Sequence, residues 1–426
     1  MSSQQKMIAG LVVGATAGLL ANALAADATW LRWVVDYLTY PVGQIFLRLL
    51  FMLVIPILFS AVVMGVCELD VRHLGRLGLR TLGYTVIISA IAVVIGLVLV
   101  NVIKPGAGLP PELRDSVRGG AVQAVAAPAN ASPVGLIIGM VPDNIVKVAA
   151  GGDMIALITF SIIFGVGLSL THTEAATRLR ETIQGVYEVS MRLIEGVLRL
   201  APIGVAALLF TMTARVGAGI FAQLAAYVGV VLLGLGIHMF VVYSISVRLF
   251  GGMSPLAFFR GIRVAALTAF STASSNATLP TALRVAEEDL RLPPHVARFV
   301  LTAGSSMNQN GTALFEGVTV LFLAQLYGVP LTLSQQAVIM VVCILGGIGT
   351  AGIPAGSLPV IAMILGMFGI PPEGIGLIIG VDRFLDMCRT TINVVGDLAA
   401  AVFVARGEHA PAEAPPQASA GSPDLG

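Results

Sequence analysis

Charged residues are scarce in this chain. Asp, Glu, Lys and Arg make up 11% of its 426 residues, against about 25% in a soluble globular domain, whereas hydrophobic residues make up 57%. A water-soluble fold could not bury so much apolar surface. Repeated apolar runs of about 18 or more residues are each long enough to cross a bilayer as a helix. The composition therefore predicts an all-α membrane protein in contact with the lipid bilayer.

Other features are missing, and each absence removes a class of function. The formal net charge is only +1, so no electrostatic argument supports binding of nucleic acid. The three cysteines, Cys67, Cys343 and Cys388, lie in apolar stretches and predict no disulfide framework. The five histidines are scattered without metal-ligand spacing. No phosphate-binding loop, zinc-protease motif or hydrolase nucleophile elbow occurs, so neither ATP-driven transport nor an enzyme with a cofactor is expected.

The first part of the chain reads as a series of membrane spans. We expect them at 7–27, 41–67, 78–104, 133–171, 181–217 and 219–249. If the spans alternate, the loops richest in arginine lie on the same side as Lys6, which predicts that this side is cytoplasmic. The Ala/Pro/Gly-rich stretch 105–133 is expected to be an exposed loop and the tail 407–426 to be disordered.

After residue 250, small and polar residues interrupt the apolar segments. The interruptions lie at 271–280, 308–312 and 346–357, and the last span is expected at 374–405. Open backbone is tolerated at membrane depth only where it lines a cavity or is buried in protein. Two such segments at corresponding places predict inverted repeats with re-entrant hairpins, and Pro280 and Pro354 are expected to break their helices. Two ordinary spans with glycine-rich packing patches are the alternative.

The last span carries a stripe of polar residues. Asp382, Asp386, Arg389, Asn393 and Asp397 are spaced four, three, four and four residues apart, so they share one helix face. Such residues at bilayer depth mark ion or substrate pathways. Arg389 can bind a carboxylate with two parallel hydrogen bonds, and Asp382 could orient it. Three carboxylates with one cation imply an external cation. A helix held to its neighbours by buried ion pairs is the alternative.

A second polar face is expected around the interruption at 308–312. Asn308, Thr312 and Glu316 repeat every four residues. Asn and Thr oxygens with freed backbone carbonyls make a site for a hard cation. Glu316 is an isolated carboxylic acid in an apolar run and is a candidate proton carrier; a neutral, hydrogen-bonded core residue or an interfacial residue is equally compatible with its position.

Several motifs together resemble the dicarboxylate/amino acid:cation symporters, the family of the archaeal aspartate transporters and mammalian excitatory amino acid transporters. The matching segments, in chain order, are 46–56 (FLRLLFMLVIP), 201–204 (APIG), 274–280 (SSNATLP), 308–312 (NQNGT), 349–354 (GTAGIP) and 386–393 (DMCRTTIN). The resemblance extends over essentially the whole chain to about residue 405.

This resemblance implies a homotrimer whose protomers work as independent elevators. Each would have eight transmembrane helices and two re-entrant helical hairpins in inverted repeats. Scaffold helices one and two would occupy 1–77, helix three of the transport domain 78–104, a loop with scaffold helices four and five 105–217, and the remaining transport domain, from helix six to helix eight, 218–406.

The resemblance also assigns roles to residues. Arg389 would bind the side-chain carboxylate of the substrate and Asp386 its ammonium group. The rest of the substrate pocket would be Ser274, Ser275, Thr312, Ile353, Pro354, Thr390 and Asn393. One sodium ion would be held by Gly304, Asn308, Asn393 and Asp397, and a second by Ser306, Ile348 and Thr350. The hairpin around 349–356 would be the gate.

Departures from the family pattern concern the coupling ions. Asn310 replaces an aspartate, Ile88 replaces a threonine ligand and Thr85 replaces a tyrosine, all at one sodium site. A hydrocarbon cannot replace a hydroxyl ligand, so this site is expected to be lost. Gln309 replaces a methionine that links substrate and sodium binding in relatives. Glu316 matches the proton-carrying position of the mammalian branch.

The sequence therefore predicts a symporter of glutamate or aspartate in a bacterial cytoplasmic membrane. Coupling to sodium is expected to be reduced and coupling to protons present. Symport of C4-dicarboxylates is the main alternative, since the ammonium-binding Asp386 is what favours amino acids. An anion channel is the strongest candidate from another class, and an intramembrane enzyme is a more distant one.

Overall fold

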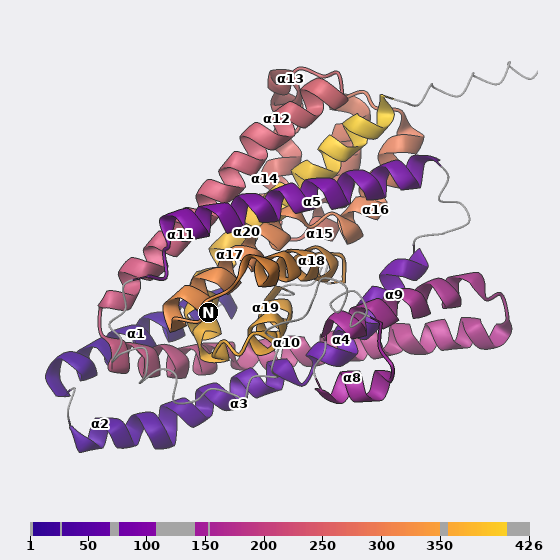
Figure 1. Cartoon of the computed structure of the whole chain (residues 1–426). Helices are drawn as coiled ribbons and strands as arrows, with labels where there is room; N and C mark the ends of the chain where they lie inside the picture. Colours follow the sequence, from indigo (N-terminus) through magenta and orange to yellow (C-terminus); the bar gives the residue numbers. More distant parts are fainter. Residues whose placement is uncertain are drawn as a thin grey trace, which may run out of the picture.

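The computed structural model of the chain describes residues 3–25, 28–68, 76–107, 141–151, 154–349 and 357–406 (Figure 1). Every regular element within these ranges is helical, and no strand occurs among them. The all-α class predicted from composition is thereby confirmed for the described residues.

The helices of the first half follow the apolar runs. After α1 (Ser3–Ala25) come α2 (Thr29–Val34), η1 (Val35–Thr39), α3 (Tyr40–Phe51) and α4 (Val54–Glu68), which together form the apolar segment Thr29–Cys67. Next are α5 (Arg76–Ile103), α8 (Ile145–Gly151), α9 (Met154–Leu170) and α10 (Glu174–Val216).

Helix α10 is long and bent. Its two parts, Glu174–Val197 and Arg199–Arg215, meet at an angle of 52°. Pro202 lies four residues after the bend and has no N–H to donate to the carbonyl at position 198. The proline therefore accounts for the kink.

The second half begins with an unusual span. α11 (Gly219–Ile237), η2 (His238–Val242), α12 (Tyr243–Ile245) and η3 (Ser246–Phe250) continue one another, and both η2 and η3 are π-helical turns. They are followed by α13 (Pro255–Gly261), α14 (Arg263–Thr272), α15 (Ser275–Arg284), η4 (Val285–Asp289), α16 (Pro294–Met307), α17 (Asn310–Tyr327), α18 (Leu333–Gly349), α19 (Ser357–Met367), the short 3-10 turn η5 (Pro372–Gly374) and α20 (Ile375–Ala405).

The polar interruption at 271–280 forms a tight turn between α14 and α15. Ala273 has a left-handed backbone with φ of 48°, which ends α14. Ser274 then caps α15, since its hydroxyl accepts a hydrogen bond from the N–H of Ala277 at 3.3 Å. The two helices contact each other, so this segment is a helical hairpin.

Pro280 lies inside α15, and the prediction that it breaks the helix is wrong. A proline leaves the carbonyl four residues earlier without a donor. Here that carbonyl belongs to Asn276, an exposed residue in the first turn, so the turn tolerates the loss. Pro354, for which the same was predicted, lies outside the described residues.

The second interruption divides the predicted span 296–328 into two helices. α16 ends at Met307 and α17 begins at Asn310, while Asn308 and Gln309 have non-helical backbones. The polar groups of the 308–312 motif are thus free to contact neighbouring helices. This break brings the polar motif to the centre of the molecule.

Four described segments are long and apolar enough to cross a membrane: Thr29–Cys67, Leu77–Ile103, Gly219–Phe250 and Pro372–Ala405, with the bent pair of α10 as a fifth. This pattern fits a multi-pass membrane protein. Within the predicted span 133–171, the described residues form two shorter helices, α8 and α9. The predicted set of eight spans and two hairpins stays a prediction.

Helix α17 is the core of the structure. All of its 18 residues except Gln325 are buried. α5, α11, α18 and α20 pack against it, although α5 comes from the first half of the chain. By contrast, α1 and α3 pack on α10, and α4 packs on α9 and α10. In Figure 1, α1 to α4 and α8 to α10 lie along one side of the molecule and α12 to α16 on the other.

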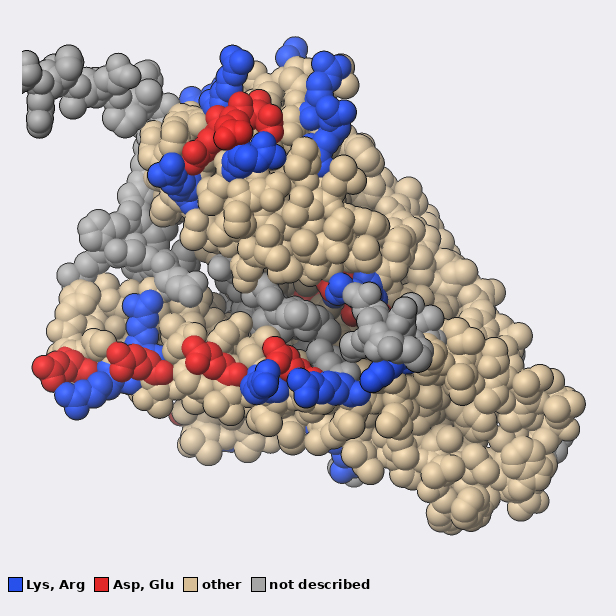
Figure 2. Space-filling view, turned by 180° about the vertical axis from the view of Figure 1, so that it is seen from behind, with Lys and Arg blue, Asp and Glu red and all other residues tan. Residues whose placement is uncertain are grey.

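The surface also fits a bilayer. Figure 2 shows charged side chains gathered at the top of one face and in a row across it, with largely uncharged surface between and beyond them and a few charges inside a hollow. On α5, the apolar side chains of Ile87 and Val102 are 61% and 75% exposed. Exposed apolar surface of this kind marks contact with a membrane or a partner.

Candidate functional site

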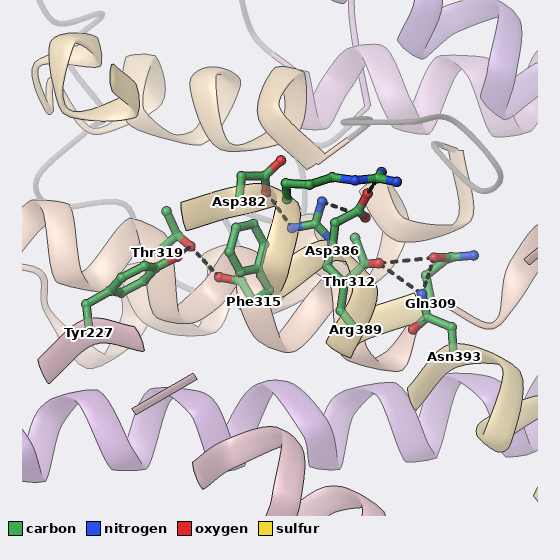
Figure 3. A network of polar contacts seen from close by, with 10 residues as sticks. Tyr227, Gln309, Thr312, Phe315, Thr319, Asp382, Asp386, Arg389 and Asn393 are labelled. Atoms are coloured by element: carbon green, nitrogen blue, oxygen red, sulfur yellow. Dashed lines mark hydrogen bonds and ion pairs between the residues drawn. The ribbon is translucent and has the colours of Figure 1, made fainter. Parts of the chain in front are cut away.

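Arg389 lies at the centre of a buried ion-pair cluster on α20. Its Nη1 donates to Oδ1 of Asp382 at 2.7 Å, and its Nη2 lies 3.0 Å from Oδ1 of Asp386 (Figure 3). The three residues lie on one helix face because they are separated by three or four residues. Asp382 thus stands where the sequence predicts the residue that orients Arg389.

Helix α17 forms the floor beneath Arg389. The guanidinium carbon of Arg389 lies 4.3 Å from the centroid of the Phe315 ring, a cation–π distance. Gly311 allows this approach, because a Cβ there would lie 2.6 Å from the carbonyl oxygen of Arg389. Phe315 was not predicted as a site residue, because its position one residue before Glu316 carries no chemical signal.

The cluster holds a second cation, Arg383. Its Nη1 lies 3.5 Å from Oδ2 of Asp386. The expectation of three carboxylates with a single cation is therefore wrong. Arg383 follows Asp382 directly, so it falls about 100° away on a helical wheel and was not counted in the stripe. Its long side chain nevertheless reaches Asp386.

Gln309, Thr312 and Asn393 form a neutral polar cluster next to the ion pairs (Figure 3). The Asn393 amide nitrogen donates to Oε1 of Gln309 at 2.6 Å and to the Thr312 hydroxyl at 3.1 Å. The Asn393 carbonyl oxygen accepts from the N–H of Gly311 at 2.8 Å. Gln309 thus joins the break before α17 to α20. Thr390 lies buried beside Arg389.

A separate pocket lies on the other side of the break. Nδ2 of Asn308 donates to Oδ1 of Asp397 at 2.9 Å, and both side chains are buried. Oδ1 of Asn308 has no hydrogen-bond partner among the described residues. Gly304 lies against the Asp397 carboxylate, where no Cβ would fit. An unpaired amide oxygen beside a buried carboxylate is a donor set that suits a hard cation.

Asn393 does not complete this pocket. It was predicted to ligate sodium with Asn308 and Asp397, but its side chain is hydrogen-bonded to Gln309, Thr312 and Gly311 instead. The structure thus brings together three of the four predicted ligands.

The position of the predicted lost site is filled by hydrogen bonds. Ser89 donates to Oδ1 of Asn310 at 2.6 Å, and Nδ2 of Asn310 donates to the Tyr243 hydroxyl at 3.1 Å. Tyr243 in turn donates to the carbonyl of Ile392 at 2.9 Å. Ile88 is a buried hydrocarbon beside this chain, and the buried Thr85 hydroxyl has no partner among the described residues.

Glu316 is enclosed within α17. Its side chain is fully buried, and neither carboxylate oxygen has a hydrogen-bond partner in the described part of the chain. It is therefore neither an interfacial residue nor a hydrogen-bonded core residue within that part. Arg389 is the cation whose field reaches it. An isolated acid at such a place requires a proton or a cation from outside, because a lone buried charge is expensive.

The first hairpin lies within the described residues, whereas the predicted second hairpin lies partly outside them. Ser274 and the buried Ser275 lie at the tip of the first hairpin, whose helix α15 contacts α20. At the second hairpin, Thr350, Ile353 and Pro354 lie outside the described residues, as do the side chains of Ser306 and Ile348. The predicted gate and second sodium site therefore stay predictions.

Comparison with known proteins identifies the family. The profile of the sodium:dicarboxylate symporter family matches residues 4–407. The chain belongs to this family. The resemblance predicted from the motifs is confirmed, and the chain is a member of a family of membrane symporters.

Relatives in the family differ in what they are named for. The proton/glutamate-aspartate symporter of Escherichia coli is 35% identical over 381 residues, which cover 88% of this chain and 87% of the relative. The proton/sodium-glutamate symport protein of Bacillus subtilis is 32% identical, covering 95% and 92%. The C4-dicarboxylate transport protein of Rhodospirillum rubrum is 32% identical, covering 86% and 82%.

Proposed function

We propose that this protein is a secondary active symporter of glutamate or aspartate, driven by a cation gradient. One observation carries the proposal: a buried guanidinium, Arg389, is held between two carboxylates on the central face of α20. Arg389 supplies the fork that captures a substrate carboxylate, and Asp386 supplies the negative partner for an ammonium group. Relatives named for glutamate and aspartate support this choice.

The remaining pocket supplies hydrogen bonds to the amino acid. Thr312, Asn393 and Thr390 would contact the substrate from α17 and α20, and Ser274 and Ser275 from the first hairpin. The Gln309–Thr312–Asn393 cluster supports this arrangement, because it presents hydroxyl and amide groups beside Arg389. Ile353 and Pro354 would close the pocket as part of the gate.

Two kinds of coupling ion fit the structure. Sodium would bind at Asn308, Asp397 and Gly304, where an amide oxygen lacks a partner beside a carboxylate. Asn393 would join only if its side chain rotated, and a second ion would bind at Ser306, Ile348 and Thr350. Glu316 would carry a proton, which its enclosure without hydrogen bonds supports. The Ser89–Asn310–Tyr243 chain supports the loss of a further sodium site.

The proposed architecture is the elevator of a homotrimer in a bacterial inner membrane. The packing of α5 on α17 supports a transport domain made of 78–104 and 218–406, and the packing of α1, α3 and α4 on α9 and α10 supports a scaffold made of the other spans. Exposed charges on α10, such as the Arg192–Glu195 pair, support a scaffold face that is not covered by lipid tails.

Symport of C4-dicarboxylates is the second candidate. Arg383 favours it, because this arginine pairs with Asp386, the carboxylate that would otherwise bind the ammonium group of an amino acid. A relative named for C4-dicarboxylate transport also supports it.

The test is uptake of labelled aspartate into liposomes that contain the purified protein, with sodium and proton gradients imposed separately. We expect saturable uptake driven by either gradient and accelerated by aspartate on the opposite side. No aspartate uptake, with uptake of succinate instead, would establish the second candidate. Steep currents that do not saturate would contradict a carrier and indicate a channel.

A further inference from the structure

Arg383 lies off the polar stripe of α20 but belongs to its ion-pair cluster. Among the four charged residues of the ion-pair cluster it is the most accessible. Its side chain is 34% exposed, against 13% for Asp386, 10% for Asp382 and 3% for Arg389. It therefore lies at the outer edge of the cluster, and Arg389 lies inside it.

Asp386 is shared between two guanidinium groups that hold it differently. Its Oδ1 lies 3.0 Å from Arg389, which is buried, stacked on Phe315 and anchored to Asp382 at 2.7 Å. Its Oδ2 lies 3.5 Å from the partly exposed Arg383. Exposed ion pairs at long distance contribute little stability. Arg383 is thus the partner that can leave Asp386 when a substrate arrives.

The second arginine also changes the net charge of the ion-pair cluster. Asp382 and Asp386 contribute two negative charges, and Arg383 and Arg389 contribute two positive charges, so the cluster is neutral. Without Arg383 the same cluster would carry one net negative charge. The electrostatic free energy of binding an anion therefore depends on Arg383, and the dependence is strongest for the anion of higher charge.

We propose that Arg383 determines the selectivity between acidic substrates with and without an ammonium group. The inference rests on the proposed function and names the residue that divides its two candidate substrate classes. An amino acid of net charge −1 places its ammonium on Asp386 and displaces Arg383 from Oδ2. A C4-dicarboxylate of charge −2 has no such group, leaves the Arg383–Asp386 pair intact, and gains the field of a second cation.

Aspartate and succinate are matched probes for this inference, because they share the four-carbon diacid skeleton and differ in the amino group. The experiment measures inhibition of labelled aspartate uptake by unlabelled aspartate and by unlabelled succinate in proteoliposomes. Binding of both acids to the protein in detergent is followed in parallel by thermal shift. The readout is the ratio of the half-inhibitory concentration of succinate to that of aspartate.

We expect Arg383→Ala to raise this ratio about tenfold, because the dianion loses the field of the second cation while the amino acid no longer has to displace Arg383 from Asp386. Arg383→Gln, which keeps side-chain length and hydrogen bonding without the charge, should raise it similarly and replaces the alanine variant if that variant does not fold. Arg383→Lys, which keeps the charge, should leave the ratio near that of the parent. Arg192→Ala removes an arginine from an exposed pair on α10 and should also leave it unchanged.

An unchanged ratio in both neutral variants, with aspartate uptake intact, would overturn the inference while leaving the proposed function standing. Equal weakening of both acids would overturn it too, since that result indicates a merely structural role. A parent protein that neither binds nor transports either acid would overturn the proposed function, and the inference with it.

Discussion

Asn308 and Asn310 stand two residues apart at the start of the central helix, yet their surroundings are opposite in kind. Asn308 lies beside a buried carboxylate and keeps one amide oxygen unpaired within the described structure. Asn310 has its amide oxygen and nitrogen engaged by two hydroxyl groups, and the residue before its partner Ser89 is the hydrocarbon Ile88. We call the first the open pocket and the second the closed network.

The difference between them is a matter of charge and unused acceptors. The open pocket has a carboxyl group and an amide oxygen without a donor among the described residues, a set that suits a cation. The closed network is neutral, and its hydrogen bonds already satisfy the groups that a cation would need. The protein thus has one place that suits a cation and one whose polar groups already bond to each other. Substitutions can make the first unsuitable for a cation and the second suitable.

The largest effect is expected from Asp397→Asn, which removes the carboxylate from the open pocket. Sodium-driven aspartate uptake should fall more than about 100-fold, because losing one member of a buried ionic contact costs about 3–5 kcal/mol. Initial uptake rates over a series of sodium concentrations measure it. Asp143→Asn, at a 77% exposed carboxylate, is the control. An unaltered half-saturating sodium concentration in the first variant would show that the open pocket does not bind the ion.

Glu316→Gln tests a position on the central helix, where an acid has no hydrogen-bond partner among the described residues. Net uptake driven by an inward proton gradient should be lost, because glutamine cannot release a proton. Exchange of internal for external aspartate should persist, since it needs no net proton movement. Labelled uptake and exchange at several pH values separate the two. Net uptake with the parent's pH dependence would remove Glu316 from the mechanism.

Opening the closed network is expected to have a moderate effect. The double variant Ile88→Thr with Asn310→Asp supplies a hydroxyl and a carboxylate next to Ser89. Sodium dependence of uptake should become steeper, with a Hill coefficient higher by about one if an additional ion binds. Asn310→Asp alone is the control, because Ile88 still denies the ion a ligand. Unchanged steepness in a transporting double variant would count against our account of the lost site.

The smallest effect is expected from Tyr243→Phe. The change removes the donor to the Ile392 carbonyl and the acceptor for Asn310, so stability should fall by about 1–2 kcal/mol. Sodium dependence should stay as it is. Thermal unfolding in detergent measures the first property and uptake the second. A change in sodium affinity would mean that the network is not sealed.

Thr85→Val is the matched control for that variant. The Thr85 hydroxyl is buried and has no partner among the described residues, so replacing it by a methyl group should be nearly neutral. A large loss of stability would reveal a partner that the described residues do not include.

Much of this arrangement could be predicted from the sequence. The spacing of Asp382 and Arg389 placed them on one helix face, and the polar run at 308–312 marked the break before α17. The departures at Ile88 and Asn310 pointed to the altered cation site. The first two signals depend on residue type and local period, which the chain records directly, whereas the departures are visible only against the family pattern.

Other features depend on the length and rotamer of a side chain, which the spacing of residues along the sequence does not record. Arg383 lies off the polar stripe, and only its long side chain brings it to Asp386. The amide of Asn393 could face either polar group, and the direction it takes depends on Gln309 and Gly311. The helix continues through Pro280 because Asn276, whose carbonyl loses its donor, is an exposed residue. Its exposure depends on the tertiary structure, which local spacing does not record.

The two π-helical turns in the span Gly219–Phe250 give that span a mechanical property of its own. Each π turn holds one residue more than an α-helical turn between the same end points. Deleting a single residue from His238–Val242 would let this turn become α-helical without shortening the path of the helix. Everything after it would then keep its rotation, because the π turn only accommodates the residue that is removed. The same deletion in the α-helical stretch Gly219–Ile237 would instead rotate Tyr243 by about 100°, turn it away from Asn310 and open the closed network, so the phase of this helix sets the chemistry of a site that it only touches.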